Sequence, residues 1–173
     1  MMPRYLAPRP LASDDRVAWF SCRSVEMTNW LRMRAEAAVV SRDTRVNVIT
    51  ADGSPDVLAY YEWRPVYLER EWTGPGRQSG TRIEPQSVVL LARLAVHLDH
   101  ERRGLGAALM ADVIARVAYL SQMTGCSGLL IHTEGHSARQ FISGLLPQAV
   151  PSPTDDLHLL VRTKDIRRTA LAS

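Results

Sequence analysis

The sequence predicts an α/β domain in which a mixed sheet is flanked by helices. The first observation is an apolar run, Val88 to Val96, which is broken only by Arg93 and is typical of a strand buried on both faces. The second is a short polar turn, residues 97–103, that leads into a helix opening at Gly104. The apolar positions of that helix recur every four residues: Leu105, Leu109, Val113 and Val117. The third is that strand and helix patterns both precede and follow this unit.

Length and composition favour one soluble domain. The chain has 173 residues, enough for a substantial core, and we expect a single domain over residues 1–173. Apolar residues make up 46% and charged residues 23%, which is ordinary for a globular protein. No apolar run approaches the ~20 residues of a membrane span. The N-terminus has no signal-peptide pattern, and Cys22 and Cys126 fit a reducing compartment, so we expect a cytoplasmic protein without a membrane partner.

The elements before the central strand are predicted from prolines, caps and alternation. Residues 3–12 resemble an edge strand because three prolines exclude a helix. Ser24 is a plausible cap for a helix that runs to about Arg42. Strands are expected at 46–50 and 57–69, joined by a turn at Asp52 and Gly53, and a long basic loop at 70–86.

The elements after the central helix are shorter. We expect a buried strand at 129–133 and a short helix at 135–144 that ends at a glycine. A proline-rich loop, 147–156, precedes a last strand at 157–162, and residues 163–173 are predicted to be a polar tail.

The central turn has the features of an anion site. Backbone N–H groups at a helix N-terminus, glycines without side chains and neighbouring arginines together favour a diphosphate. The positive charge of the chain is nearly all arginine, since Lys164 is the only lysine, and the sequence pI is about 9.2. Arginine suits phosphate binding, but a biased genome would give the same excess, so nucleic-acid binding does not follow from composition alone.

The order of the elements and the turn Gly104-Leu-Gly106-Ala107 resemble the GNAT acetyltransferase fold. The resemblance implies a splayed central strand pair and acetyl-CoA as cofactor. The pantetheine arm would then lie against Leu94, Ala95 and Val96. The phosphates would meet the start of the helix and the turn before it: Arg102, Arg103, Gly104, Leu105, Gly106, Ala107 and Ala108.

Four segments in order resemble the GNAT toxins of toxin–antitoxin modules. Phe20-Ser-Cys-Arg and the Trp30-Leu-Arg that follows are similar to their "FxCG…LxxWL" opening, and Leu58-Ala-Tyr-Tyr to their "GYY" strand. Leu91-Ala-Arg-Leu-Ala-Val is similar to "LGRLAV", and Ala138-Arg-Gln-Phe with Pro151-Ser-Pro-Thr-Asp-Asp-Leu to "AxxFY…PDDPLTL". This resemblance implies acetylation of the α-amine of aminoacyl-tRNA, a ribbon-helix-helix antitoxin as partner, and a homodimer.

Three positions depart from that pattern. Glu101 stands where the family has Arg or Gln, and His97 where an aspartate is usual. Ile142 replaces the tyrosine that is thought to protonate the leaving thiolate, and isoleucine has no proton to donate. Ser143, Glu134 and Tyr61 are therefore the catalytic candidates that the sequence offers, together with Tyr60, a water and His132, and the sequence does not rank them.

The arginines predict where RNA would bind. Arg70, Arg77 and Arg82 in the basic loop and Arg93 in the central strand are the tRNA-binding candidates. The histidines and cysteines show no metal-ligand spacing, so we expect no metal. Two alternatives stay open: a GNAT enzyme acting on a small-molecule or protein amine, and a catalytically impaired homologue that binds acetyl-CoA.

Overall fold

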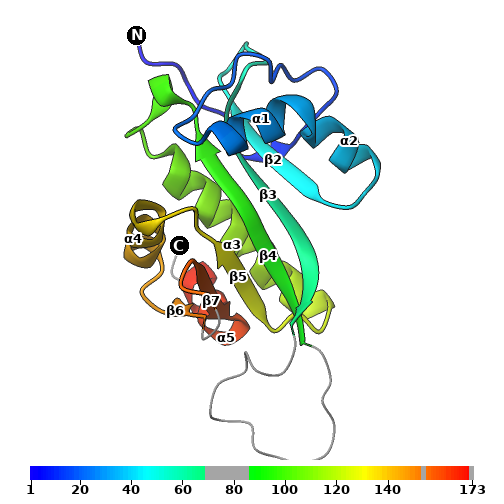
Figure 1. The fold of residues 1–173 in the computed structure, drawn as a ribbon, viewed down its shortest axis with the longest axis vertical. Helices are drawn as coiled ribbons and strands as arrows, with labels where there is room; N and C mark the ends of the chain where they lie inside the picture. The colour runs from blue at the N-terminus through cyan, green and yellow to red at the C-terminus, as the bar shows by residue number, and fades with distance from the viewer. Residues whose placement is uncertain (69–85, 153–154, 172–173) are drawn as a thin grey trace, which may run out of the picture. The chain divides into compact units, whose positions relative to one another are not determined.

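The computed structural model describes residues 1–68, 86–152 and 155–171. The strands lie in one seven-stranded sheet in the order β1-β2-β3-β4-β5-β7-β6, which with the helices confirms the predicted α/β class (Figure 1). The chain divides into two compact units, the first formed by Met1–Arg64 with Leu91–Val113 and the second by Pro65–Leu90 with Ile114–Ser173. The boundary cuts through β3, β4 and α3, and the single-domain expectation stays a prediction.

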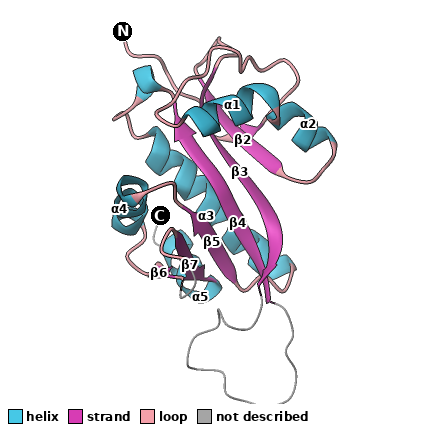
Figure 2. Ribbon diagram, viewed as in Figure 1, coloured by secondary structure: helices cyan, strands magenta, loops and turns pink. Residues whose placement is uncertain are grey.

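The first unit contains the N-terminal half of the sheet. Its strands are β1 (Arg9–Pro10), β2 (Arg45–Thr50), most of β3 (Val57–Leu68) and the second half of β4 (Gln86–Val96). Both β1 and β3 pair with β2 in the antiparallel sense, which confirms the predicted hairpin of β2 and β3, seen side by side in Figure 2. Of the edge strand expected over residues 3–12, only Arg9 and Pro10 form a strand. The unit also holds α1 (Val25–Met33), α2 (Ala35–Val40) and the start of α3 (Leu105–Met123).

Aromatic side chains form the centre of the first unit's core. The Phe20 and Tyr60 rings meet edge to face with their centroids 5.3 Å apart, and Trp30 stacks on Tyr60 at 6.1 Å. The Tyr60 hydroxyl donates to the backbone oxygen of Met27 at 2.8 Å. Burial raises the pKa of Tyr60 well above its usual range, so this phenol keeps its proton and serves as a structural donor.

The predicted helix from Ser24 to Arg42 is wrong in its extent. Ser24 does cap it, since its hydroxyl accepts the Met27 N–H at 3.1 Å. The helix breaks at Arg34, where φ is −124° and ψ is −25°, and the second piece ends at Val40. The break separates α1 from a short helix whose first residue, Ala35, is completely buried in the core.

The second unit contains the C-terminal strands and helices. β5 (Gly128–His132) pairs with β7 (His158–Arg162), which in turn pairs with β6 (Val150–Pro151), all antiparallel. A Cβ at Gly128 would lie 2.6 Å from the backbone oxygen of Val161, so the close approach of these strands requires glycine there. α4 (His136–Leu145) extends one residue beyond the glycine where its end was predicted, and β6 lies in the predicted proline-rich loop.

The predicted polar tail is wrong, because residues Thr163–Leu171 form α5 (Figure 1). Ile166 is completely buried, and it is the only large apolar residue that this helix buries. Polar contacts hold the rest: Arg167 donates to the hydroxyl and to the backbone oxygen of Ser121 at 3.0 Å each. One buried apolar residue in nine leaves no apolar periodicity for the sequence to reveal. Among the described residues, no helix is long and apolar enough to cross a membrane.

Candidate functional site

The turn between β4 and α3 forms a helix N-terminus open to solvent. A 3-10 helix, Leu98–His100, leads into the turn, and α3 begins at Leu105, one residue later than predicted. Gly104 has φ +81°, a left-handed conformation that glycine adopts without strain. The first hydrogen bond of α3 runs from the Ala108 N–H to the Gly104 oxygen, so the amides before it have no partner inside the helix. These amides lie at the positive end of the helix dipole, which suits an anion.

The charges around this turn leave it positive. Arg102 and Arg103 are exposed, and Arg102 also has a left-handed backbone with φ +58°. The Glu101 carboxylate accepts two hydrogen bonds from Arg23, each of 2.8 Å, and these bonds lower the pKa of Glu101. The negative charge of Glu101, which would repel a phosphate, is thus offset by Arg23. Both turn arginines, Arg102 and Arg103, can therefore contact an anion. The partner of Glu101 lies 78 residues away and could not be read from the motif.

His97 is the N-cap of the 3-10 helix. Its Nδ1 accepts the Asp99 N–H at 3.1 Å, as a carboxylate would at the start of the 3-10 helix. Because Nδ1 accepts, Nε2 carries the proton and donates to the backbone oxygen of Trp19 at 3.2 Å. The backbone N–H of His97 donates to Leu58 at 2.8 Å and fixes the end of β4 on β3. The aspartate of the family is therefore replaced here without loss of the turn.

The end of β4 carries the three residues predicted to contact pantetheine. Ala95 is buried, whereas Leu94 and Val96 are half-buried. Alternate residues of a strand face opposite sides of the sheet, so Leu94 and Val96 share one face. Their role in cofactor binding stays a prediction.

Arg93 is engaged by two carboxylates. It donates to Glu62, whose side chain is 2% exposed, and to Glu26 at 2.6 Å and 3.2 Å. Its guanidinium also lies over the Trp30 ring, 4.6 Å from the centroid. Burial opposes the charge on Arg93, but the bonds to Glu26 and Glu62 outweigh it and raise the pKa of Arg93. The predicted tRNA contact of Arg93 would compete with these partners.

The three catalytic candidates differ in exposure. Tyr61 is completely buried in the first unit, and its hydroxyl donates to the Asp112 carboxylate at 2.5 Å. Glu134 and Ser143 belong to the second unit, where both are exposed. Ile142 is 4% exposed on α4. The hydroxyl proton of Tyr61 is thus already used in a strong hydrogen bond, whereas Ser143 can meet solvent or a ligand.

A histidine pair closes the β5–β7 ladder in the second unit. His132 and His158 are register partners, and His158 Nε2 lies 2.9 Å from His132 Nδ1. His158 Nδ1 lies 3.6 Å from the Asp155 carboxylate. Imidazoles bonded in this way can pass a proton from one ring to the next. His132 was a weak candidate in the sequence, and its partner emerges only once the strand register is known.

The remaining sequence predictions concern the other tRNA contacts and a metal site. Arg70, Arg77 and Arg82 lie outside the described residues. Within the described ranges, no group of three or more His, Cys, Asp or Glu side chains could hold a metal ion.

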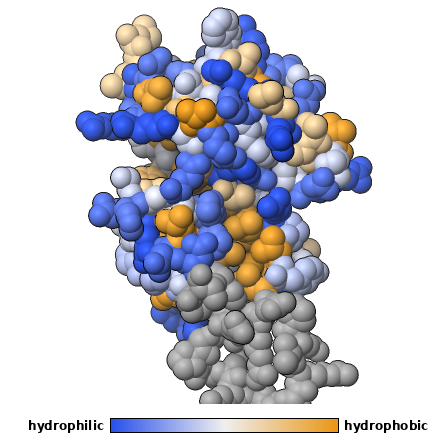
Figure 3. Space-filling view, viewed as in Figure 1, coloured by the Kyte–Doolittle hydropathy of each residue, from blue (hydrophilic) through white to orange (hydrophobic). Residues whose placement is uncertain are grey.

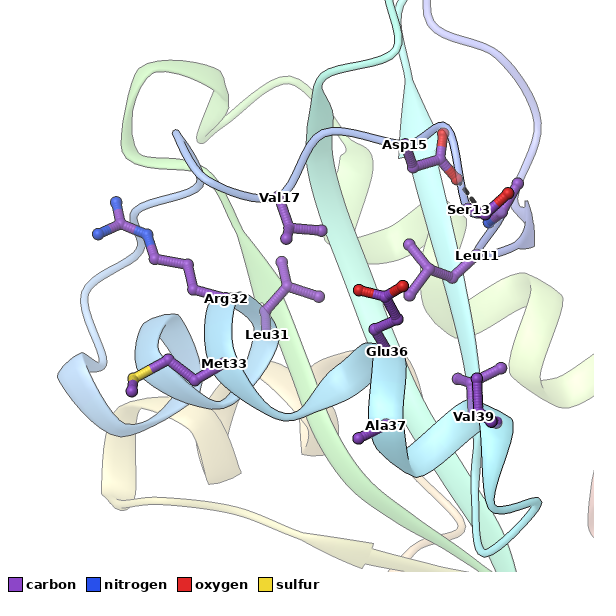
Figure 4. Close-up of a pocket in the computed structure, with 12 residues that line it drawn as sticks. Leu11, Ser13, Asp15, Val17, Leu31, Arg32, Met33, Glu36, Ala37 and Val39 are labelled. Atoms are coloured by element: carbon purple, nitrogen blue, oxygen red, sulfur yellow. Dashed lines mark hydrogen bonds between the residues drawn. The ribbon is translucent and has the colours of Figure 1, made fainter.

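An apolar groove lies in the first unit between the N-terminal segment and the helices α1 and α2 (Figure 4). Val17 and Leu31 point toward each other across it, and Glu36 points from α2 toward the N-terminal segment. On the face drawn in Figure 3, hydrophobic side chains gather in one group in the lower middle of the coloured surface and are interspersed with hydrophilic ones elsewhere. The exposed large apolar residues of α1 and α2 are Val25, Met33 and Val40.

Substituting Gly104 tests the turn. A Cβ at Gly104 would meet no atom within 4 Å, so the cost of Gly104→Ala comes from the left-handed backbone alone. We expect a loss of about 1 kcal/mol in the free energy of unfolding, measured by urea denaturation. Gly144→Ala is the matched control: its Cβ also meets nothing, but it lies in α4, where alanine should stabilise by about 0.5–1 kcal/mol. Equal effects of the two changes would contradict the role of the Gly104 backbone.

Known toxins resemble this chain in both sequence and structure. The chain is 34% identical over 166 residues to a tRNA-acetylating toxin of Mycobacterium tuberculosis (strain ATCC 25618 / H37Rv), covering 96% of this chain and 97% of the relative. The structure is similar to AtaTR bound with AcCoA, with a TM-score of 0.84, 21% identity, and 96% and 98% of the two chains covered. It is also similar to a tyrosine-to-phenylalanine mutant of KacT, with a TM-score of 0.86, 20% identity, and 96% and 99% covered.

A third solved structure is AtaT complexed with acetyl-methionyl-tRNAfMet, with a TM-score of 0.84, 21% identity, and 94% and 98% of the two chains covered. No family model matches the sequence. The GNAT fold is thus confirmed by structure, and the near-complete match to a curated relative confirms the narrower resemblance. The chain belongs to the family of tRNA-acetylating toxins within the GNAT N-acetyltransferase superfamily.

Proposed function

We propose that the protein is an acetyl-CoA-dependent N-acetyltransferase that acetylates the α-amine of aminoacyl-tRNA and so blocks translation. The observation that carries the proposal is the 34% identity, over almost the whole chain, to a tRNA-acetylating toxin. The solvent-open turn at the start of α3, with exposed Arg102 and Arg103, agrees with the cofactor that this activity requires.

The turn would hold the diphosphate of the cofactor. The amides at the start of α3 would donate to its oxygens, and Arg102 and Arg103 would supply positive charge. Leu94 and Val96 would line the pantetheine arm. When bound, acetyl-CoA supplies an activated acetyl thioester.

The chain's own residues have two tasks in the transfer, which are to polarise the thioester carbonyl and to protonate the thiolate. The α-amine of an aminoacyl ester is less basic than a free α-amine, whose pKa is about 7.7–8.0, so a strong general base is dispensable. A backbone N–H near Val96 would polarise the thioester carbonyl. The thiolate needs a proton, for which Ser143, Glu134, Tyr61 and His132 are the available groups in place of Ile142. The hydrogen bond from its hydroxyl to Asp112 counts against Tyr61.

The partners follow from the same family. One solved neighbour is a tyrosine-to-phenylalanine mutant of the toxin AtaT bound to the C-terminus of the antitoxin AtaR. We expect this protein to be held by a ribbon-helix-helix antitoxin, to form a homodimer and to act in the cytoplasm. Arg70, Arg77 and Arg82 are the proposed tRNA contacts, and their charge predicts an affinity that falls steeply with salt.

A second candidate function rests on Ile142. The side chain at this position is apolar and 4% exposed, and it has no proton to donate. A homologue that binds acetyl-CoA without turnover, and persists as the partner of an antitoxin, would fit that feature.

One experiment separates these functions. Purified protein is mixed with labelled acetyl-CoA and charged total tRNA, and acetyl transfer to the aminoacyl-tRNA is counted. Transfer supports the proposal, and binding of acetyl-CoA without transfer to any aminoacyl-tRNA favours the second function. Transfer to small or protein amines in parallel reactions, but not to tRNA, would move the enzyme to another substrate class.

Reversing a charge in the turn tests the cofactor site. We expect Arg102→Glu to weaken acetyl-CoA binding at least about tenfold, because it replaces a cation that bonds phosphate with an anion that repels it. Calorimetry with acetyl-CoA measures the change. Arg168→Glu, an equally exposed change on α5, is the control and should leave the affinity unchanged. Equal affinities in the two variants would rule out the turn as the diphosphate site.

A further inference from the structure

The basic turn is tied to the N-terminal segment by a chain of hydrogen bonds. Arg103 donates to the Tyr5 hydroxyl at 3.0 Å, and that hydroxyl lies 2.9 Å from His100 Nδ1. The Tyr5 and His100 rings also meet edge to face, 5.7 Å apart. Neither Tyr5 nor His100 belongs to the glycine motif of the turn, and neither was predicted from the sequence to contribute to the site.

Backbone contacts fix Tyr5 in this position. The residues on either side of it bond to the end of β2 and to the turn that follows: Leu6 N–H donates to the Thr50 oxygen at 2.9 Å, and Asp52 N–H donates to the Arg4 oxygen at 2.8 Å. Tyr5 itself forms an isolated antiparallel bridge with Ala51. The Tyr5 side chain is half-buried, and backbone hydrogen bonds hold the segment from which it reaches the turn.

The directions of the two hydrogen bonds follow from Arg103, which can donate but cannot accept. A guanidinium only donates, so the Tyr5 oxygen accepts from Arg103. The Tyr5 O–H then donates to His100 Nδ1, which must carry a lone pair, and the His100 ring is neutral with its proton on Nε2. Burial, Arg103 and His97 all lower the pKa of His100, and Asp99 opposes them weakly. Geometry and charge therefore agree on a neutral His100 in the protein without ligand.

The charged and titratable groups around His100 come from three elements. They are Tyr5 from the N-terminal segment, His97 and Asp99 at the 3-10 helix, and Glu101, Arg102 and Arg103 from the turn, with Arg23 paired to Glu101. The pair of Glu101 and Arg23 is neutral as a unit, so the two turn arginines outweigh Asp99. An anion bound at the turn would reverse this balance and favour a positive imidazole.

We propose that Tyr5 and His100 form a proton-linked clamp that positions Arg103 on the diphosphate of coenzyme A. This inference rests on the proposed function of the turn as the cofactor site. When His100 takes up one proton from solvent, its Nδ1–H donates to the Tyr5 oxygen, which still accepts from Arg103. The Tyr5 O–H is then released from His100 and turns to a phosphate oxygen. No covalent bond changes, and the ligand gains one hydrogen bond and one nearby positive charge.

The clamp predicts that coenzyme A binds with uptake of a proton. Affinity should rise as the pH falls from about 8 through the pKa of His100 in the complex, and should level off below the pKa of the ligand-free protein. The phosphomonoester of coenzyme A itself titrates near pH 6, so the contribution of His100 is the difference between the protein and its variants.

The test is calorimetry with coenzyme A between about pH 6 and about pH 8, in two buffers of different ionisation enthalpy. The unaltered protein should show proton uptake beyond that of the ligand. Tyr5→Phe keeps the ring but loses the hydroxyl, and should bind roughly threefold to tenfold more weakly at low pH. His100→Gln should abolish the extra proton uptake and leave only the pH dependence that comes from the phosphomonoester of coenzyme A. Tyr119→Phe makes the same chemical change at an exposed position of α3 and should behave as the unaltered protein.

The outcomes separate the two claims. If the unaltered protein does not bind coenzyme A, the proposed cofactor site fails and the clamp falls with it. If it binds, but Tyr5→Phe and His100→Gln keep its affinity and its pH profile, the clamp alone is wrong. A loss of affinity in Tyr5→Phe that is equal at every pH would also overturn it, because that is the result of a purely structural contact. Thermal unfolding of each variant checks that it is folded at every pH used.

Discussion

Replacing Arg93 with leucine is expected to lower the free energy of unfolding by about 3–5 kcal/mol, the usual cost of breaking a buried ion pair from one side. Glu62 has a side chain that is 2% exposed, so without Arg93 its carboxylate would stay buried without the cation that pairs with it. Glu26 is 55% exposed and can return to water at little cost. Urea denaturation measures the loss. Arg64→Leu, an exposed change on the neighbouring strand β3, is the control and should stay within about 0.5 kcal/mol of the original.

The double variant Arg93→Leu/Glu62→Leu separates the buried charge from the arginine itself. Removing both partners leaves no buried carboxylate without its cation, so most of the lost stability should return. A single variant that costs less than about 1 kcal/mol, or a double variant no better than the single, would contradict the buried pair as the cause. The double variant is also the proper test of the predicted tRNA contact, since it removes the guanidinium while keeping the fold.

Arg93 also illustrates what the sequence could and could not predict. The strand around it was predicted because apolar runs and alternation are local signals. The partners of Arg93 lie 67 and 31 residues away, and no local pattern relates them to it. For that reason the sequence offered Arg93 only as a tRNA contact, and that contact stays a prediction.

The helices likewise differ in whether a local sequence pattern reveals them. The apolar face of α3 was visible at regular spacing, whereas α5 buries one large apolar residue and is held by side chains that bond to Ser121. The break between α1 and α2 was equally hidden, because the apolar spacing of the sequence continues across Arg34. Tertiary contacts decide both cases.

The cofactor turn was predictable in its motif and not in its surroundings. Gly104 and the helix after it could be recognised from a short stretch of sequence. The arginine that offsets Glu101 and the tyrosine that bonds Arg103 lie 78 and 98 residues from their partners. Residues that complete a site from distant segments are found only when the fold is known.

Introducing the missing tyrosine should give the largest change in activity. If proton donation to the thiolate limits the transfer, Ile142→Tyr should acetylate aminoacyl-tRNA about 10²–10⁴ times faster than Ile142→Phe, which is the range of general acid catalysis. The comparison with phenylalanine is essential. Ile142 is 4% exposed, so either ring overfills its site at a cost of about 1–3 kcal/mol, and only the hydroxyl differs between the two variants.

The measurement is the initial rate of labelled acetyl transfer at saturating acetyl-CoA, with thermal unfolding to show that both variants are equally folded. Equal rates for tyrosine and phenylalanine, both near that of the original protein, would mean that another group delivers the proton. In that case Ser143→Ala and His132→Gln would identify it, because these residues of the second unit offer an exposed hydroxyl and an imidazole bonded to His158. A tyrosine variant that gains transfer where the original protein has none would instead place the loss of catalysis at Ile142, since the cofactor turn is the same in both proteins.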